Sequence, residues 1–230
     1  MNEDEIQAGG LSLPELLLGE RPVKHYEQII KVTIHHYYLT GEITDENDKY
    51  VDMMHTMMTA EPHDKIFLHI NTPGGDLTTT VAIIAAMKAS DAEITTVIEG
   101  EACSGGTFIF LAGDNYIVND YSSFMIHNYT HGPYGKGAEV ANRVKFTEEH
   151  YKELCEGYYT GFLTDDELEQ VLDDKDFWMS SKEVKERLRN QMKGTLLEFD
   201  EMEEVEVPVK KKPAPKKKPA PKKKAASKKR

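Results

Sequence analysis

The sequence predicts an α/β fold made of repeated βαβ units with a parallel sheet. Segments rich in β-branched and aromatic residues alternate with segments whose apolar residues recur at helical spacing. Glycine-containing turns separate several of them, and 39% hydrophobic residues are enough for one core in a chain of 230 residues. Alternation of this kind indicates parallel strands joined by right-handed crossovers.

The chain is expected to begin its folded part with a strand, a helix and a second strand. Residues 31–43 are rich in β-branched and aromatic side chains and end near a glycine, which is typical of a strand. A helix is predicted over 45–60, with Thr44 or Asp45 as its cap, because valine and methionine recur there at helical spacing. Residues 65–70, KIFLHI, predict the second strand.

The same alternation continues through the middle of the chain. The glycine pair in 71–76, NTPGGD, indicates a turn, and a helix is expected over 77–90. Residues 93–100 predict a third strand, and the apolar run over 104–113 predicts a buried helix. Two short strands are then expected in the segments NYIVND and SFMIHN.

Helices dominate the rest of the chain. The glycine- and tyrosine-rich residues 128–138 indicate a loop, and a long helix is predicted over 139–161. A second helix over 164–175 is expected to open with a capping box formed by Thr164 and Glu167. Another helix follows the segment DFWM, with Ser180 or Ser181 as its cap.

Charge divides the chain into a folded body and a tail. The net charge is −12, but residues 210–230 hold 12 of the 28 basic residues and no acidic one, so the first 209 residues carry a net charge of −24. The tail repeats lysine with proline and alanine, a composition typical of extended, disordered chain. We therefore expect an N-terminal segment over 1–30, one domain over 31–197, and an acidic then lysine-rich disordered tail over 198–230.

The composition also limits where the protein is expected to be located and which partners it is expected to bind. The acidic N-terminus lacks the charge of a signal peptide, and the apolar runs are shorter than a membrane span, so a soluble, cytoplasmic protein without membrane contact is expected. The two cysteines have no zinc-site spacing and are expected to be reduced thiols. An acidic body repels nucleic acid, which leaves only weak binding through the tail.

The segment around Ser104, EGEACSGGTFIFLAGD, raises two interpretations. Small residues at a strand-to-helix turn can serve packing alone. Alternatively, Ser104 is a nucleophile at a helix N-terminus, where free N–H groups suit an oxyanion. The pattern is close to the G-x-S-x-G turn of serine hydrolases, with Ala102 in place of the first glycine.

A nucleophilic serine needs a base, and His127 is the candidate among nine histidines because it closes the apolar strand SFMIH. The alternative is a structural, hydrogen-bonded histidine. A carboxylate should orient the imidazole. Asp176 is the candidate, since the apolar run Phe177–Met179 that follows is expected to bury it partly.

Two glycines are candidates for an oxyanion hole. Gly75 follows a strand and Gly105 follows the serine, so both N–H groups are expected at the same edge of the sheet. A nucleotide-binding glycine loop is excluded, because neither G-x-x-x-x-G-K-[ST] nor G-x-G-x-x-G occurs.

Several segments together resemble the proteolytic subunit of the Clp protease, a serine peptidase family within the crotonase-like superfamily. The resemblance covers roughly residues 30–190 and rests on these segments: YYLTGEITDENDKY, LHINTPGGDL, GEACSGGTFIFLAG, FMIHN and YGKGAEV. It implies the crotonase-like βαβ fold with a protruding helical handle.

The resemblance also implies roles for residues. Ser104 would be the nucleophile, His127 the general base and Asp176 the orienting acid, with Asp174 or Asp173 as alternatives for the last role. Gly75 and Gly105 would form the oxyanion hole, although Gly105 stands where the family usually has methionine.

At the level of the assembly, the resemblance implies two stacked heptameric rings that enclose a chamber. An unfoldase of the AAA+ ATPase class would feed unfolded proteins into it. The chain itself would bind no cofactor and no metal, since ATP is used by the partner.

Two other functions stay open from the sequence. One is a signal-peptide-peptidase-like enzyme with a lysine base, which the MIH strand disfavours. The other is a non-catalytic scaffold subunit of the same fold, which the joint presence of Ser104, His127 and Asp176 disfavours.

Overall fold

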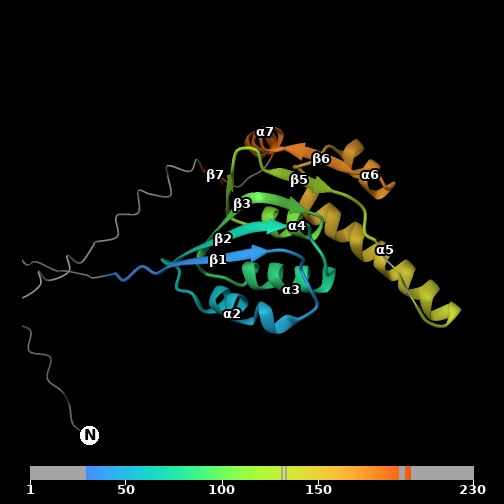
Figure 1. The fold of residues 1–230 in the computed structure, drawn as a ribbon, viewed down its shortest axis with the longest axis horizontal. Coiled ribbons are helices and arrows are strands. Elements are labelled where there is room, and N and C mark those ends of the chain that lie inside the picture. Colours follow the sequence, from blue (N-terminus) through green and yellow to red (C-terminus); the bar gives the residue numbers. More distant parts are fainter. Residues whose placement is uncertain (1–29, 131, 133, 192–194, 198–230) are drawn as a thin grey trace, which may run out of the picture. The chain divides into compact units, whose positions relative to one another are not determined.

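The strands form one twisted, mainly parallel sheet, as the computed structural model in Figure 1 shows. The structure describes residues 30–130, 132, 134–191 and 195–197, without the side chains of Asn47 and Gln191. The described residues from Ile34 onward belong to one compact unit, and residues 30–33 belong to a different unit. The N-terminal segment, apart from residue 30, and the predicted tail lie outside the described residues.

The described strands confirm the predicted α/β class and most of its order. They are β1 (Ile34–Thr40), β2 (Lys65–Thr72), β3 (Glu93–Cys103), β4 (Asn115–Val118), β5 (Ser123–Ile126), β6 (Phe177–Ser180) and β7 (Thr195–Leu196). The order β1-β2-β3-β4-β7 is parallel throughout. The last part of β3 pairs instead with β5, which pairs with β6 in antiparallel fashion.

Strand β3 is longer than predicted, and its length positions the site. The strand was predicted over 93–100, but it continues to Cys103 and pairs there with β5. The register between β2 and β3 shifts at this point, and the Asn71 side chain accepts the Glu101 N–H at 3.2 Å. Because of this extension, β3 and β5 end side by side.

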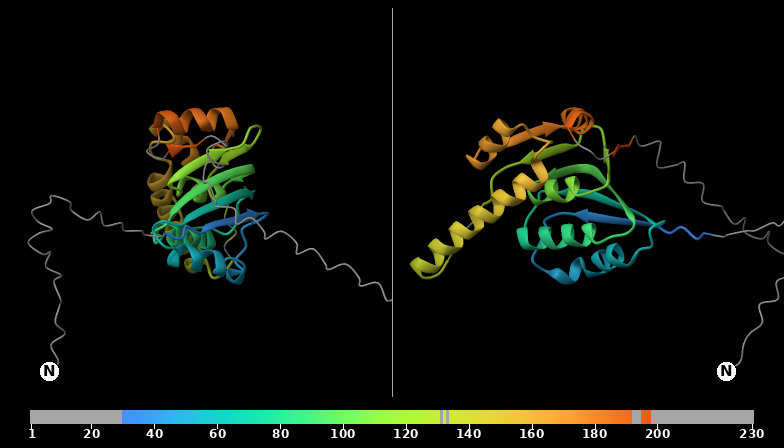
Figure 2. Two further views of the ribbon diagram at one scale, coloured as in Figure 1. Left: turned by 90° about the vertical axis from the view of Figure 1, so that its left-hand side faces the viewer. Right: turned by 180° about the vertical axis from the view of Figure 1, so that it is seen from behind.

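The described helices lie largely where the periodicity predicts them. They are α2 (Val51–Thr59), α3 (Leu77–Lys88), α4 (Gly105–Leu111), α5 (Gly137–Tyr159), α6 (Asp165–Leu172) and α7 (Ser181–Gln191), with a 3-10 turn η1 (Asn47–Lys49) before α2. Helices α2 and α3 lie on one side of strands β1 to β3 (Figures 1 and 2). The buried helix α4 contacts α3, β2 and β3, so its N-terminus lies at the carboxyl ends of the strands.

Helix caps were predicted with mixed success. The Thr164–Glu167 capping box is confirmed, with the Thr164 Oγ1 accepting the Glu167 N–H at 3.2 Å. The prediction of Thr44 or Asp45 as the first cap is wrong. The chain passes through η1 and the helix begins only after Tyr50, whose hydroxyl accepts the Thr44 N–H.

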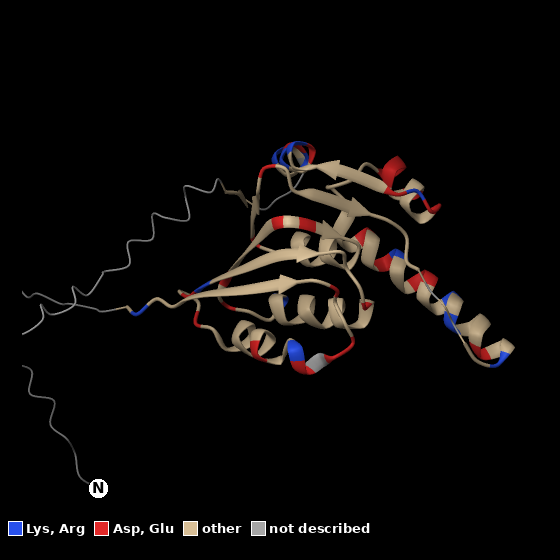
Figure 3. Ribbon diagram, in the orientation of Figure 1, with Lys and Arg blue, Asp and Glu red and all other residues tan. Residues whose placement is uncertain are grey.

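Helix α5 supplies the expected protruding handle. It extends away from the sheet (Figure 1), and its first half is mostly exposed. Acidic and basic residues alternate along it (Figure 3), and ion pairs such as Lys145–Glu149 form between them. Only its second half packs on the core, through the buried Tyr151, Cys155 and Tyr159.

The strand β6 was not predicted, because FWMS looked like an apolar stretch before a helix. Its hydrogen-bonding partner is β5, which lies far back in the sequence. Both cysteines are free, as expected, and both are buried. No described helix is long and apolar enough to cross a membrane.

Candidate active site

Ser104 occupies a strained turn between β3 and α4. Its φ of 52° and ψ of −122° lie outside the regions that non-glycine residues commonly adopt. Its N–H donates to the Met125 carbonyl at 2.8 Å, which ties the turn to β5. The side chain makes no capping hydrogen bond to α4. The turn therefore holds a half-buried serine hydroxyl at a helix N-terminus without using it for local structure.

Two glycines let the loop after β2 pack closely between its neighbours, with Gly74 against the Ser104 turn and Gly75 against Ile43. A Cβ on Gly74 would lie 2.6 Å from the Ser104 Cβ, and φ there is +95°. A Cβ on Gly75 would lie 2.0 Å from the Ile43 carbonyl oxygen. Only glycine, which lacks a Cβ, allows such close approaches. The glycine pair in the predicted turn at 71–76 is therefore what lets this loop lie next to Ser104.

The predicted oxyanion donors are placed together. Ile43 bonds to the Gly74 carbonyl and to the Asp76 N–H, at 2.8 and 2.7 Å, and these bonds do not use the Gly75 N–H. Gly105 is the first residue of α4, so its N–H has no acceptor within the helix. Gly75, Ser104 and Gly105 line one cavity of about 400 Å³.

His127 follows β5 at the same edge of the sheet. The pair Cys103 and Met125 is the last in the parallel register, so Ser104 and His127 both lie just beyond it. His127 is half-buried, and its carbonyl accepts the Tyr151 hydroxyl at 2.5 Å. Within the described residues, its ring forms no hydrogen bond with Ser104 or Asp176. The structure thus places the serine and the histidine on adjacent strand ends.

Asp176 lies opposite His127 but is exposed, so the expected partial burial is wrong. The antiparallel register ends with the pair Ile126 and Phe177, and His127 and Asp176 are the next residues beyond that pair on the two strands. Side chains alternate along a strand, so Asp176 shares a face of β6 with Trp178, which is 64% exposed. The apolar run therefore packs only its other face on the core.

The alternative carboxylates have different surroundings. The Asp174 carboxylate accepts the Asn128 Nδ2 at 2.7 Å and its backbone has φ 66°. Asp173 ends α6 and is exposed. The register favours Asp176 as the neighbour of His127, and the choice among the three stays a prediction.

The cysteine beside the serine is not a competing nucleophile. Burial, with a smaller contribution from Glu101, raises the pKa of Cys103 to about 11. The side chain is 3% exposed. It is a protonated thiol at neutral pH, and only a thiolate attacks efficiently.

The cavity extends from Ser104 along helix α5. Its walls include Phe108 of α4 and Arg143, Phe146 and Tyr151 of α5. His127 and Asp176 are not among its lining residues. In the described part of the chain, no group of His, Cys, Asp and Glu side chains is arranged to hold a metal ion.

Comparisons with known proteins agree with the resemblance seen in the sequence. A family model described as Clp protease matches residues 19–187. The chain is 29% identical over 169 residues to the ATP-dependent Clp protease proteolytic subunit 2 of Cutibacterium acnes, which covers 70% of this chain and 76% of that protein.

Proposed function

Because the chain belongs to the Clp protease family, we propose that it is a serine endopeptidase subunit with Ser104 as nucleophile. The observation that carries the proposal is the strained Ser104 turn, which opens into the cavity that Gly75 and Gly105 also line. If this turn served only the packing of β3 against α4, it would need neither the Ser104 hydroxyl, which makes no capping hydrogen bond, nor the N–H groups of Gly75 and Gly105 beside it.

The reaction follows from these placements. The Ser104 Oγ attacks a peptide carbonyl while His127 takes its proton, and the N–H groups of Gly75 and Gly105 donate to the oxyanion. The tetrahedral intermediate then breaks its C–N bond as His127 protonates the leaving amine. Water, activated by His127, hydrolyses the acyl-enzyme and frees Ser104. Asp176 orients the imidazole.

This mechanism requires hydrogen bonds from His127 to Ser104 and to Asp176 that form when the site is engaged. Histidine and aspartate lie on facing strand ends, and catalytic hydrogen bonds commonly tighten only when substrate or partner is bound. No cofactor bound by this chain takes part in the proposed reaction.

The assembly belongs to the proposal as well. The name of the Cutibacterium acnes relative describes a proteolytic subunit of an ATP-dependent protease. We infer for this chain two stacked heptameric rings that receive unfolded proteins from an AAA+ ATPase. Exposed apolar side chains support contacts between copies, notably Trp178 on the edge strand β6 and Phe146 on the handle. A cytoplasmic location is part of the same proposal.

The two alternative functions have less support. A lysine base is disfavoured because the residue that follows β5, next to the end of β3 that leads to Ser104, is a histidine, His127. A scaffold subunit would have no use for the open N–H groups at the serine, but it shares the fold and needs an experiment to separate it.

A fluorophosphonate probe on the purified, assembled protein tests the proposal. We expect the label on Ser104, none in Ser104→Ala, and at least about 10³-fold slower labelling in His127→Ala. His55→Ala, an exposed histidine on α2, is the control and should label like the parent. Equal labelling of Ser104→Ala would refute the assignment. An unlabelled parent, both alone and with candidate ATPases, would support the scaffold instead.

A further inference from the structure

Three tyrosines of helix α5 pack around one phenylalanine next to the nucleophile. Phe108, in the first turns of α4, contacts the rings of Tyr151, Tyr158 and Tyr159 at centroid distances of 5.9, 6.1 and 4.5 Å. Phe108 is fully buried. The base of the handle is therefore fixed to the helix that begins at Ser104.

The hydroxyl groups of these tyrosines differ in what they bind. The Tyr151 hydroxyl donates to the His127 carbonyl at 2.5 Å. The Tyr159 hydroxyl bonds to the Thr107 Oγ1 at 2.6 Å. The Tyr158 hydroxyl is buried and has no hydrogen-bond partner among the described residues. Two of the three hydroxyls thus lead to the candidate catalytic residues.

The direction of the second chain of hydrogen bonds is determined. Thr107 Oγ1 donates its own proton to the Ser104 carbonyl at 2.6 Å, so Tyr159 is the donor to Thr107. Burial raises the pKa of Tyr151 and of Tyr159. Both phenols therefore keep their protons as donors at any pH at which the protein works.

The Ser104 carbonyl matters because of the peptide plane to which it belongs. That plane is rigid, and its other end is the Gly105 N–H, which points opposite to the carbonyl. A hydrogen bond that holds the Ser104 carbonyl therefore also directs the Gly105 N–H. This N–H is one of the two proposed oxyanion donors.

The His127 carbonyl has a comparable role. Strand β5 ends at Ile126, so the ladder of the sheet no longer holds His127. The Tyr151 hydroxyl supplies an anchor at that point. Through it, the position of α5 sets the backbone from which the imidazole extends.

We propose that Tyr151 and Tyr159 are positioning residues of the active site, Tyr151 for the base His127 and Tyr159, through Thr107, for the oxyanion donor Gly105. This inference rests on the proposed function. It assigns to the handle helix two separate contributions to one reaction, one to proton transfer and one to stabilisation of the oxyanion.

The variants Tyr151→Phe and Tyr159→Phe test the proposal, because each removes one hydroxyl and keeps the ring on Phe108. Tyr158→Phe is the matched control, since its hydroxyl has no hydrogen-bond partner in the part of the chain that the structure describes. The measurements are peptide kcat and KM, the rate of fluorophosphonate labelling as a function of pH, and the melting temperature. All rates are expressed per folded subunit.

We expect each of the two variants to lower kcat and the labelling rate about 10-fold with little change in KM, because only transition-state interactions are affected. Tyr151→Phe should also move the pH midpoint of labelling, whereas Tyr159→Phe should not. Tyr158→Phe should match the parent. Thr107→Val should reproduce Tyr159→Phe and the double variant should add little, while Thr107→Ser should retain the parent rate.

The outcomes separate this inference from the proposed function. If the parent labels and both variants label like Tyr158→Phe, the positioning roles are refuted and the serine peptidase stands. A lower melting temperature with unchanged kcat would show a merely structural role and also refute the inference. If Tyr159→Phe does not fold, the Thr107 variants decide the same link. An unlabelled parent would refute both proposals.

Discussion

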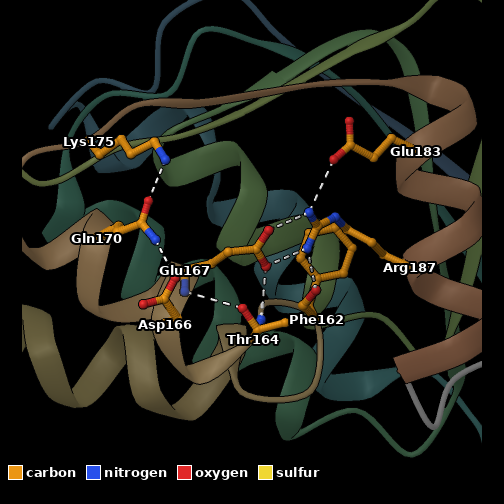
Figure 4. Close-up of polar contacts among 8 residues, drawn as sticks. All are labelled: Phe162, Thr164, Asp166, Glu167, Gln170, Lys175, Glu183 and Arg187. Atoms are coloured by element: carbon orange, nitrogen blue, oxygen red, sulfur yellow. Dashed lines mark hydrogen bonds and ion pairs between the residues drawn. The ribbon is translucent and has the colours of Figure 1, made fainter.

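An ion pair between helices α6 and α7 is expected to stabilise the fold, and its loss is measurable. Arg187 Nη1 and Nη2 each donate to one oxygen of the Glu167 carboxylate at 2.8 Å (Figure 4). Nη1 also donates to the Phe162 carbonyl at 3.2 Å. The side chains of Arg187 and Glu167 are 15% and 21% exposed, so the pair is closer to a buried one than to a surface one.

The magnitude follows from that burial. Removing one partner of a buried pair costs about 3–5 kcal/mol, and exposed pairs contribute about 0–1 kcal/mol. We expect Arg187→Met to lower the free energy of unfolding by about 2–3 kcal/mol, between these limits. Glu167→Gln should cost less, about 1–2 kcal/mol, because glutamine can still accept the Thr164 N–H in the capping box.

The same pair predicts a pH dependence. Hydrogen bonding to Arg187 lowers the pKa of Glu167 to about 2, against the opposing effect of burial. A carboxyl group with a depressed folded pKa stabilises the protein above its unfolded pKa of about 4.3, and this stabilisation is lost as the pH falls toward the folded pKa. After allowance for solvent screening, the pH-dependent part of the free energy of unfolding that Glu167 contributes is about 1–2 kcal/mol.

Urea unfolding followed by far-UV circular dichroism, at pH 7 and at pH 3, measures both effects. Glu183→Gln is the control: Glu183 is 45% exposed and accepts from Arg187 at 3.1 Å, so its loss should cost no more than about 0.5 kcal/mol. The reasoning is refuted if Arg187→Met is no less stable than this control. It is also refuted if Glu167→Gln loses as much stability as the parent between pH 7 and pH 3.

Two further predictions concern other parts of the fold. Gly74→Ala should slow the labelling of Ser104 at least about 10-fold, because its Cβ would lie 2.6 Å from the serine Cβ; Gly157→Ala, whose Cβ meets nothing within 4 Å, should label normally, and equal rates would contradict the assigned contact. His36 bonds to His69 at 2.9 Å, and burial and that neighbour lower the pKa of His36. The melting temperature of the parent should therefore fall between pH 7.5 and about pH 5.5, below the unfolded histidine pKa, and fall less in His36→Gln; identical decreases would exclude this origin.

Local patterns were sufficient for most of the fold. Strands β1 to β5 and the helices between them follow from β-branched runs and apolar spacing, which are properties of neighbouring residues. Strand β6 was missed because its pairing with β5 joins segments far apart in the sequence. The end of β3 was predicted at residue 100, three residues too early, for the same reason, since its last residues pair with β5.

The sequence predicted that the glycines and the serine of the candidate site lie near one another, but it predicted less of the surrounding geometry. The spacing of Gly75, Ser104 and Gly105 along the chain indicated a shared edge of the sheet, and one cavity brings them together. The burial of Asp176 was predicted wrongly, because the alternation along β6 decides which side chains face the core. Nothing in the sequence indicated that Tyr151 contacts His127.

The sequence by itself determined the α/β class, the glycine-serine turn and the capping box of α6, because each depends on the conformational preferences of adjacent residues. Only the tertiary structure decided which strand ends meet and that the Asp176 side chain is exposed. It also decided that the Tyr151 hydroxyl bonds to His127 and the Tyr159 hydroxyl to Thr107. These relations depend on register and on the packing of α5 against α4, and both arise only when distant segments share one core.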